Sequence, residues 1–151
     1  MAVKLCEQRV FLSKYQFDAD RLNKCKLDWS GLEKVYEKHS ASVAELQIAA
    51  SYFLETLRHF PQVHSVRLRI KDPEHLVSKI IRKKIESPER EITPDNYSTE
   101  ITDLIGIRAL HLFKDDWLQI HDFVQRNWNL VEKPKAYVRK GDPEALIDLF
   151  K

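Results

Sequence analysis

Basic side chains gather in one short stretch of this 151-residue chain, and an aspartate follows a short way downstream. Between residues 67 and 84 the sequence has seven basic residues (67, 69, 71, 79, 82, 83 and 84) against two acidic ones (72 and 74). Asp103 and Arg108 then lie in an otherwise apolar run, TDLIGIRALHLF, at residues 102–113. Lysine and arginine hold phosphates, and Mg²⁺ commonly binds one or two carboxylates together with substrate oxygens. These residue types have the elements of a metal–nucleotide site.

Two plainer interpretations stay open at this point. The basic face of an amphipathic helix is usually just solvated, and Asp103 with Arg108 would also suit a purely structural ion pair. An unpaired charge buried in so apolar a run would cost roughly 3–5 kcal/mol. Both residues therefore need a partner, solvent or a ligand.

The basic stretch divides into a predicted strand and a predicted helix. Residues 64–71 alternate between apolar and basic side chains, which is the period of a half-buried strand. Asp72-Pro73-Glu74 is typical of a helix start, with an N-cap, a proline at the first helical position and an acid in the first turn. The helix has an apolar face, made of Leu76, Val77, Ile80, Ile81 and Ile85. Its polar face carries His75, Lys79 and Arg82.

The apolar run predicts a central strand at residues 104–113, with Leu104 and Leu110 buried. Asp103 would stand at the edge of this strand. We expect Lys83 to lie near the solvated edge of the helix. The four other cations should converge on one groove beside Asp103: Arg69, Lys71, Lys79 and Arg82.

A long amphipathic helix is predicted ahead of the basic stretch. Ser30-Gly31-Leu32-Glu33 matches a capping box, and Pro61 would end the helix. His39 lies in the apolar stripe, where we interpret it as a core-edge residue and not a ligand. The stripe would pack on the rest of the domain or form a dimer seam, so an oligomer stays open. Its members are Leu32, Tyr36, His39, Val43, Leu46, Ala50, Phe53, Leu57 and Phe60.

Composition narrows the classes of protein. The net charge of +2 is too small to argue for nucleic-acid or membrane binding. The two cysteines have no metal-ligand spacing and no apolar signal segment is present, so we expect a cytoplasmic protein without a membrane partner. With three glycines in the chain, neither of the two common glycine-rich phosphate loops can be present. Any phosphate site must use side chains.

Two segments in this order resemble the RelA/SpoT family of alarmone synthetases. The first runs from Arg69-Ile70-Lys71-Asp72-Pro73-Glu74-His75 through Lys79 to Arg82-Lys83, and the second is Asp103-Leu104-Ile105-Gly106-Ile107-Arg108. The resemblance covers about residues 62–140 and extends to the leading helix. It implies an α+β, nucleotidyltransferase-like fold with a mixed β-sheet flanked by helices. It also implies transfer of pyrophosphate from ATP to the 3′-hydroxyl of GDP or GTP.

The resemblance assigns a role to each motif residue. Arg69 and Arg108 would sandwich the adenine, and Lys71, Lys79 and Arg82 would hold the triphosphate. Asp103 would be the catalytic residue that binds Mg²⁺. His75 stands where the family usually has a serine that contacts the phosphates.

Some family segments have no counterpart in this sequence. The chain has neither the Gly-Tyr loop that stacks on guanine nor the Glu-x-Gln-x-Arg strand that supplies a second carboxylate. Asp142-Pro143-Glu144 predicts a further helix close to the last residue. We therefore expect a truncated chain, with an N-terminal helical region at 1–61 and part of a synthetase domain at 62–151. Such a fragment should not make alarmone by itself.

Two alternatives to this function remain open. One is a toxin-type relative with the same fold that pyrophosphorylates RNA ends, the only case in which a nucleic acid would be a partner. The other is a non-catalytic interaction module whose long helix forms the partner surface.

Overall fold

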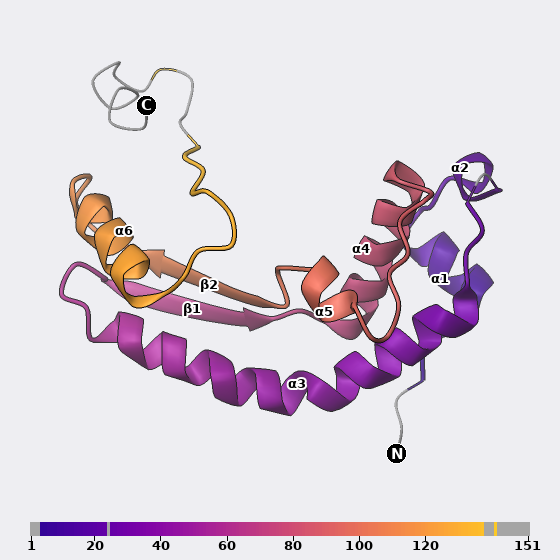
Figure 1. Cartoon of the computed structure of the whole chain (residues 1–151), viewed down its shortest axis with the longest axis horizontal. Coiled ribbons are helices and arrows are strands. Elements are labelled where there is room, and N and C mark those ends of the chain that lie inside the picture. The colour runs from indigo at the N-terminus through magenta and orange to yellow at the C-terminus, as the bar shows by residue number, and fades with distance from the viewer. Residues whose placement is uncertain (1–3, 24, 138–140, 142–151) are drawn as a thin grey trace. The chain divides into compact units, whose positions relative to one another are not determined.

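The computed structural model describes residues 4–23, 25–137 and 141, which form a mixed α+β structure (Figure 1). The chain divides into two compact units, residues 1–112 and 113–151. The first unit contains the predicted nucleotide site.

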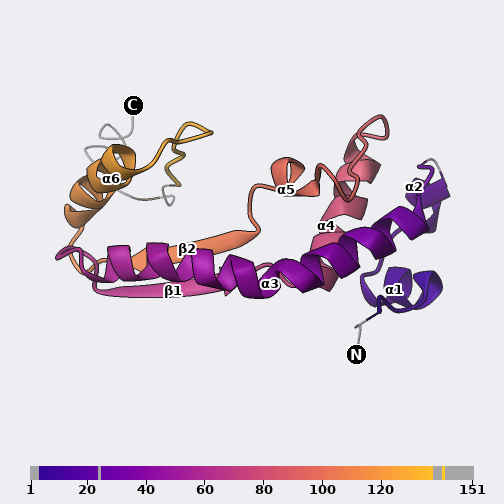
Figure 2. The same ribbon diagram turned by 60° about the horizontal axis from the view of Figure 1, so that its bottom comes forward.

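Helix α3 (Trp29–Arg58) is the longest element of the first unit. In both views its first half lies alongside helix α4 and its second half alongside the two strands (Figures 1 and 2). The predicted stripe is confirmed: five of its members are buried and the other four are half-buried. The predicted capping box is wrong. Asp28 is the N-cap, and its carboxylate accepts a hydrogen bond from the Gly31 N–H at 3.0 Å. The helix also ends before Pro61, with His59 as its C-cap.

Strands β1 (Ser65–Ile70) and β2 (Ile105–Leu110) form a two-stranded antiparallel sheet. The predicted strand at 64–71 is therefore confirmed. The prediction for 104–113 is correct for Leu104, which is buried, but wrong for Leu110, which is 45% exposed. Because no third strand is present among the described residues, β2 is not a central strand. The residues that face α3 are half-buried, whereas those on the other face are open to solvent.

Helix α4 (Pro73–Glu86) begins as predicted, with the Asp72 carboxylate accepting the His75 N–H at 3.0 Å. Its buried apolar face, made of Leu76, Val77, Ile80 and Ile81, packs in the core with residues from α1, α3 and the segment around the short helix α5 (Tyr97–Glu100). These partners include Phe11, Leu32, Val35, Tyr97, Ile101 and Leu104. The core therefore sits under α4 and fixes the direction of its polar face.

Two short helices precede α3. They are helix α1 (Gln8–Lys14) and helix α2 (Ala19–Asn23). Phe11 is fully buried and contacts Tyr15 and Trp29 through their rings. Helix α1 is thus anchored in the core of the first unit.

The second unit contains helix α6 (Asp116–Asn127), which has no buried residue. The helix predicted at Asp142–Glu144 lies outside the described residues. In the part of the chain that the structure describes, no helix combines the length and the apolar composition needed to cross a membrane.

The cap of α3 can be tested by substitution. Asp28→Ala removes the acceptor for an otherwise unpaired N–H and should lower the free energy of unfolding by about 1 kcal/mol. Asp28→Asn keeps a capping oxygen and should stay close to the wild type. Urea unfolding of the two variants measures the difference. Equal losses would show that the carboxylate charge, and not the cap, stabilises this end of the helix.

Candidate nucleotide site

Asp103 stands between two lysines at the entrance to β2. Lys71 Nζ donates a hydrogen bond to one carboxylate oxygen at 2.8 Å, and Lys79 Nζ lies 2.8 Å from the other. The side chains of Lys71 and Lys79 are 12% and 28% exposed, and that of Asp103 is 48% exposed. The expectation that Asp103 lies beside the cations is therefore met. The alternative that Asp103 and Arg108 form a structural ion pair is not borne out, since both oxygens of Asp103 face lysines.

The lysine pair dominates the protonation of Asp103. Partial burial of the carboxylate raises its pKa, but the hydrogen bonds and charges of Lys71 and Lys79 together lower it more, to about 2. Asp103 is therefore a carboxylate at neutral pH. Both of its oxygens face ammonium groups that could instead hold phosphates.

The backbone of Lys71 is held on both sides. Its N–H donates to the Leu104 carbonyl at 2.8 Å, and its carbonyl lies 2.7 Å from Nε2 of His39. His39 therefore donates from Nε2, while its buried Nδ1 has no hydrogen-bond partner among the described residues. The histidine is fully buried and its ring packs edge-on against Tyr97. His39 is thus a core residue that also positions the start of the site.

The predicted cations line two adjoining hollows. One has a volume of about 350 Å³ and the other about 320 Å³. Lys71 and Arg82 line both hollows, so the two share a wall of positive charge. The first hollow adds Tyr15, Phe17, Arg69, His75 and Ser78, and the second adds Lys79, Lys83, Glu86 and Asp103. All four cations expected in the groove are therefore present in this surface.

Three arginines, Arg67, Arg69 and Arg108, occupy the open face of the sheet, and Arg69 also lines the first hollow. Arg67 is directly opposite Arg108, and Arg69 is directly opposite Gly106. All three guanidinium-bearing residues are exposed, and Arg108 makes no ion pair with the described residues. Like charges directly opposite across two strands are destabilising. This face can therefore bind an anion, or a planar ring that stacks on the guanidinium groups.

Several lining residues were missed by sequence reasoning. Tyr15 and Phe17 come from the N-terminal stretch, where no periodic pattern pointed to a function. Glu86 closes the second hollow from the last residue of α4. Lys83 was expected near the solvated edge, but it is half-buried and lines the second hollow. It therefore belongs to the cationic surface.

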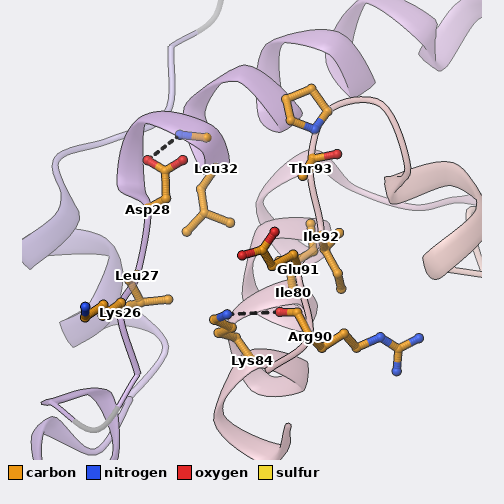
Figure 3. A pocket seen from close by; sticks show the side chains of 12 residues that line it. Lys26, Leu27, Asp28, Leu32, Ile80, Lys84, Arg90, Glu91, Ile92 and Thr93 are labelled. Carbon is orange, nitrogen blue, oxygen red and sulfur yellow. Dashed lines mark hydrogen bonds between the residues drawn. The ribbon is translucent and has the colours of Figure 1, made fainter. Parts of the chain in front are cut away.

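A third hollow, of about 230 Å³, lies between the start of α3, the end of α4 and residues 90–94 (Figure 3). It contains none of the predicted site residues. Two of its charged side chains have partners: Lys84 donates to the Arg90 carbonyl at 3.1 Å, and the Arg90 side chain pairs with Glu100.

The donor set limits how a metal ion could bind. The described residues contain no cluster of three or more His, Cys, Asp or Glu side chains that could hold one. Mg²⁺ commonly takes one or two carboxylates and completes its six ligands with water and substrate phosphates. Asp103, half-exposed and lining a hollow that also contains Lys71, Lys79 and Arg82, fits that kind of shared site.

The chain was compared with known proteins. A family model described as "Region found in RelA / SpoT proteins" matches residues 68–145, just over half of the chain. The matched segment includes β1 from Leu68 onward, all of α4 and both motifs that carry the cations and Asp103. No curated protein and no solved structure gives a significant match.

The charge pairing of Asp103 predicts a pH-dependent stability. Its folded-state pKa lies below the ordinary value of 3.8, so the stabilisation is present above that value and is lost as the pH falls toward 2. The side chain is half-exposed, so the contribution should be under about 1 kcal/mol. Urea unfolding of wild type and Asp103→Asn should therefore differ most near neutral pH and converge below pH 3.8. Asp95→Asn, which removes an exposed carboxylate with one lysine partner, is the control. A difference that stays constant across the pH range would contradict the lysine pairing.

Proposed function

The chain belongs to the RelA/SpoT family, and we propose that it carries the ATP-binding side of an alarmone synthetase with a nucleotidyltransferase-like fold. The reaction would transfer pyrophosphate from ATP to the 3′-hydroxyl of GDP or GTP. The observation that carries this proposal is the placement of one carboxylate, Asp103, between two lysines in the second of two cation-lined hollows, which share Lys71 and Arg82.

The triphosphate would bind along the wall shared by the two hollows. Lys71 and Arg82 line both of them, and Lys79 lies on the Asp103 side. A phosphate chain offers charges that can replace the Asp103 oxygens as partners of the two lysines. The site can therefore exchange an internal ion pair for a substrate without leaving a lysine unpaired.

The adenine would bind on the open face of the sheet between Arg69 and Arg108. These residues are diagonal neighbours across the two strands, because Arg69 pairs with Gly106 and Arg108 lies two residues further along β2. Diagonal neighbours are roughly 7–8 Å apart. Stacked carbon atoms are separated by about 3.5–4.0 Å, so this gap suits one flat ring with a guanidinium on each side. Gly106 adds no side chain to fill the gap.

Asp103 would hold Mg²⁺ together with phosphate oxygens. The ion would neutralise charge on the phosphates and keep the transferred group in place. The residues of this chain would bind the donor ATP, orient its β-phosphorus and shield its phosphate groups from water. The acceptor 3′-oxygen forms a bond to that phosphorus as the bond to the bridging α–β oxygen breaks, and AMP leaves.

Binding of ATP tests the proposal directly. Mg²⁺ alone should not bind measurably, since the only carboxylate at the centre of the described site is already paired with two ammonium groups. ATP with Mg²⁺ should bind, and the ion should bind only when ATP is present. Titration calorimetry separates these two cases, and chromatography with ATP and GDP should show no transfer by residues 1–151. Tight Mg²⁺ binding without nucleotide, or transfer of pyrophosphate, would overturn this assignment of the chemistry.

The stacking role of Arg108 can be tested by a substitution that keeps its positive charge. Arg108→Lys retains the cation but loses the planar group that stacks on a base, so ATP should bind more weakly by on the order of 1 kcal/mol or more. Arg58→Lys is the matched control, because Arg58 pairs with Glu55 at the far end of α3. Calorimetry should show no change for the control. Equal losses in the two variants would favour a diffuse basic surface over a defined adenine site.

A further inference from the structure

Helix α1 is joined to the first turn of α4 by two polar contacts. Glu74 forms an ion pair with Lys14 and accepts a hydrogen bond from the Tyr15 hydroxyl at 3.1 Å. These partners are 59 and 60 positions apart in sequence. The contacts therefore tie the N-terminal segment to the residue that immediately precedes His75.

His75 is supported from both its backbone and its ring. Its N–H is held by the Asp72 carboxylate, and its ring packs edge-on against Tyr15, with centroids 6.0 Å apart. Tyr15 in turn contacts the fully buried Phe11, with ring centroids 4.5 Å apart. The imidazole thus rests on an aromatic column that reaches the core.

His75 then contacts Arg69. Its Nδ1 lies 3.4 Å from a terminal nitrogen of the guanidinium. A guanidinium can only donate, so Nδ1 is the acceptor in this contact. Arg69 makes no ion pair with a carboxylate in the described part of the chain. His75 is therefore the side chain that orients this arginine.

A strained turn brings α1 to this place. Gln16 has a φ of 52°, which is uncommon for a residue other than glycine. The turn is closed by the Phe17 N–H donating to the Leu12 carbonyl at 3.0 Å. Tyr15 and Phe17, on either side of it, both line the hollow that contains Arg69 and His75. Such conformations persist where the surrounding structure fixes them, often at ligand sites.

We propose that Tyr15, Glu74 and His75 are positioning residues that hold the Arg69 guanidinium in the plane on which the base of the nucleotide stacks. The inference rests on the proposed function, and it assigns His75 to the base side of the site instead of the phosphate side. Lys14 and Phe11 complete the support from helix α1. The N-terminal segment thus takes part in recognising the base, although the hydrogen bonds of Lys14 and Tyr15 go to Glu74 and not to the lysines beside Asp103.

Comparing two ligands distinguishes a role in positioning the base from a general effect on binding. ATP offers a base and a triphosphate, whereas inorganic tripolyphosphate offers the phosphates alone. His75→Ala should weaken Mg²⁺–ATP binding roughly fivefold, the size expected for one lost hydrogen bond, and leave tripolyphosphate binding unchanged. His75→Asn places a carbonyl oxygen where it can accept from Arg69 and should restore most of the ATP affinity. Equal weakening of both ligands, or no weakening of either, would overturn the proposal.

A measurement without nucleotide keeps this test separate from that of the proposed function. Failure of the wild-type protein to bind ATP would contradict the function. The Arg69 side-chain N–H signals in NMR spectra should still shift in His75→Ala and return toward their wild-type positions in His75→Asn. Signals that are unchanged in His75→Ala would show that the histidine does not hold the arginine, whatever the protein binds.

The contribution of α1 is tested at Tyr15. Tyr15→Ala removes the ring beneath His75 and should weaken ATP binding severalfold with little effect on tripolyphosphate, while Tyr15→Phe keeps the ring and should lose less. Tyr52→Ala, a tyrosine that is 66% exposed on α3, is the matched control and should change neither ligand. Urea unfolding shows whether Tyr15→Ala still folds. If it does not, the His75 pair decides the question. A folded Tyr15→Ala with wild-type ATP binding would overturn the role of α1.

Discussion

The pairing of Asp103 with Lys71 and Lys79 is the interaction on which the site depends, because its three members come from three different parts of the chain. Lys71 follows β1, Lys79 lies on α4, and Asp103 precedes β2. The antiparallel ladder places the end of β1 beside the start of β2, and the buried apolar face of α4 turns its polar face toward that end of the sheet. His39 holds the Lys71 carbonyl from α3. Secondary structure, core and site are thus coupled through these two ion pairs.

The balance of charge around this pairing explains why a substrate with several negative charges suits the site. Without a ligand, one carboxylate serves two lysines, while Arg82 and Lys83 add further positive charge beside them. On the sheet, Arg67 and Arg108 stand opposite each other with no acid between them. A bound phosphate chain would offset this excess of positive charge, and a flat ring would occupy the space above Gly106. The same closely spaced cations therefore lower the stability of the free protein and favour binding of the ligand.

Local patterns predicted the elements that carry the lysines, because their signals lie within a few residues. Alternation identified β1, and Asp72-Pro73-Glu74 identified the start of α4. Burial of residues 104–113 was overestimated because apolar composition was taken as burial on both faces. The alternation of Ile105, Ile107 and Ala109 with Gly106, Arg108 and Leu110 is that of a strand with one open face. The start of α3 was misplaced since Asp28 and Ser30 are both good caps, and hydrogen bonding to Gly31 decides between them.

The contribution of α1 could not have been predicted from a local pattern, because its contacts with Glu74 and His75 join residues about sixty positions apart. The same separation in sequence divides the site residues into two groups. The residues proposed to hold phosphates all lie within the segment matched by the family model, whereas Lys14 and Tyr15 lie outside it. If Tyr15 and Glu74 position Arg69 as proposed, changes at Tyr15 would alter how that arginine is held, whereas the ion pairs of Asp103 do not involve Tyr15. Recognition of the base would then vary independently of the charges that hold the triphosphate.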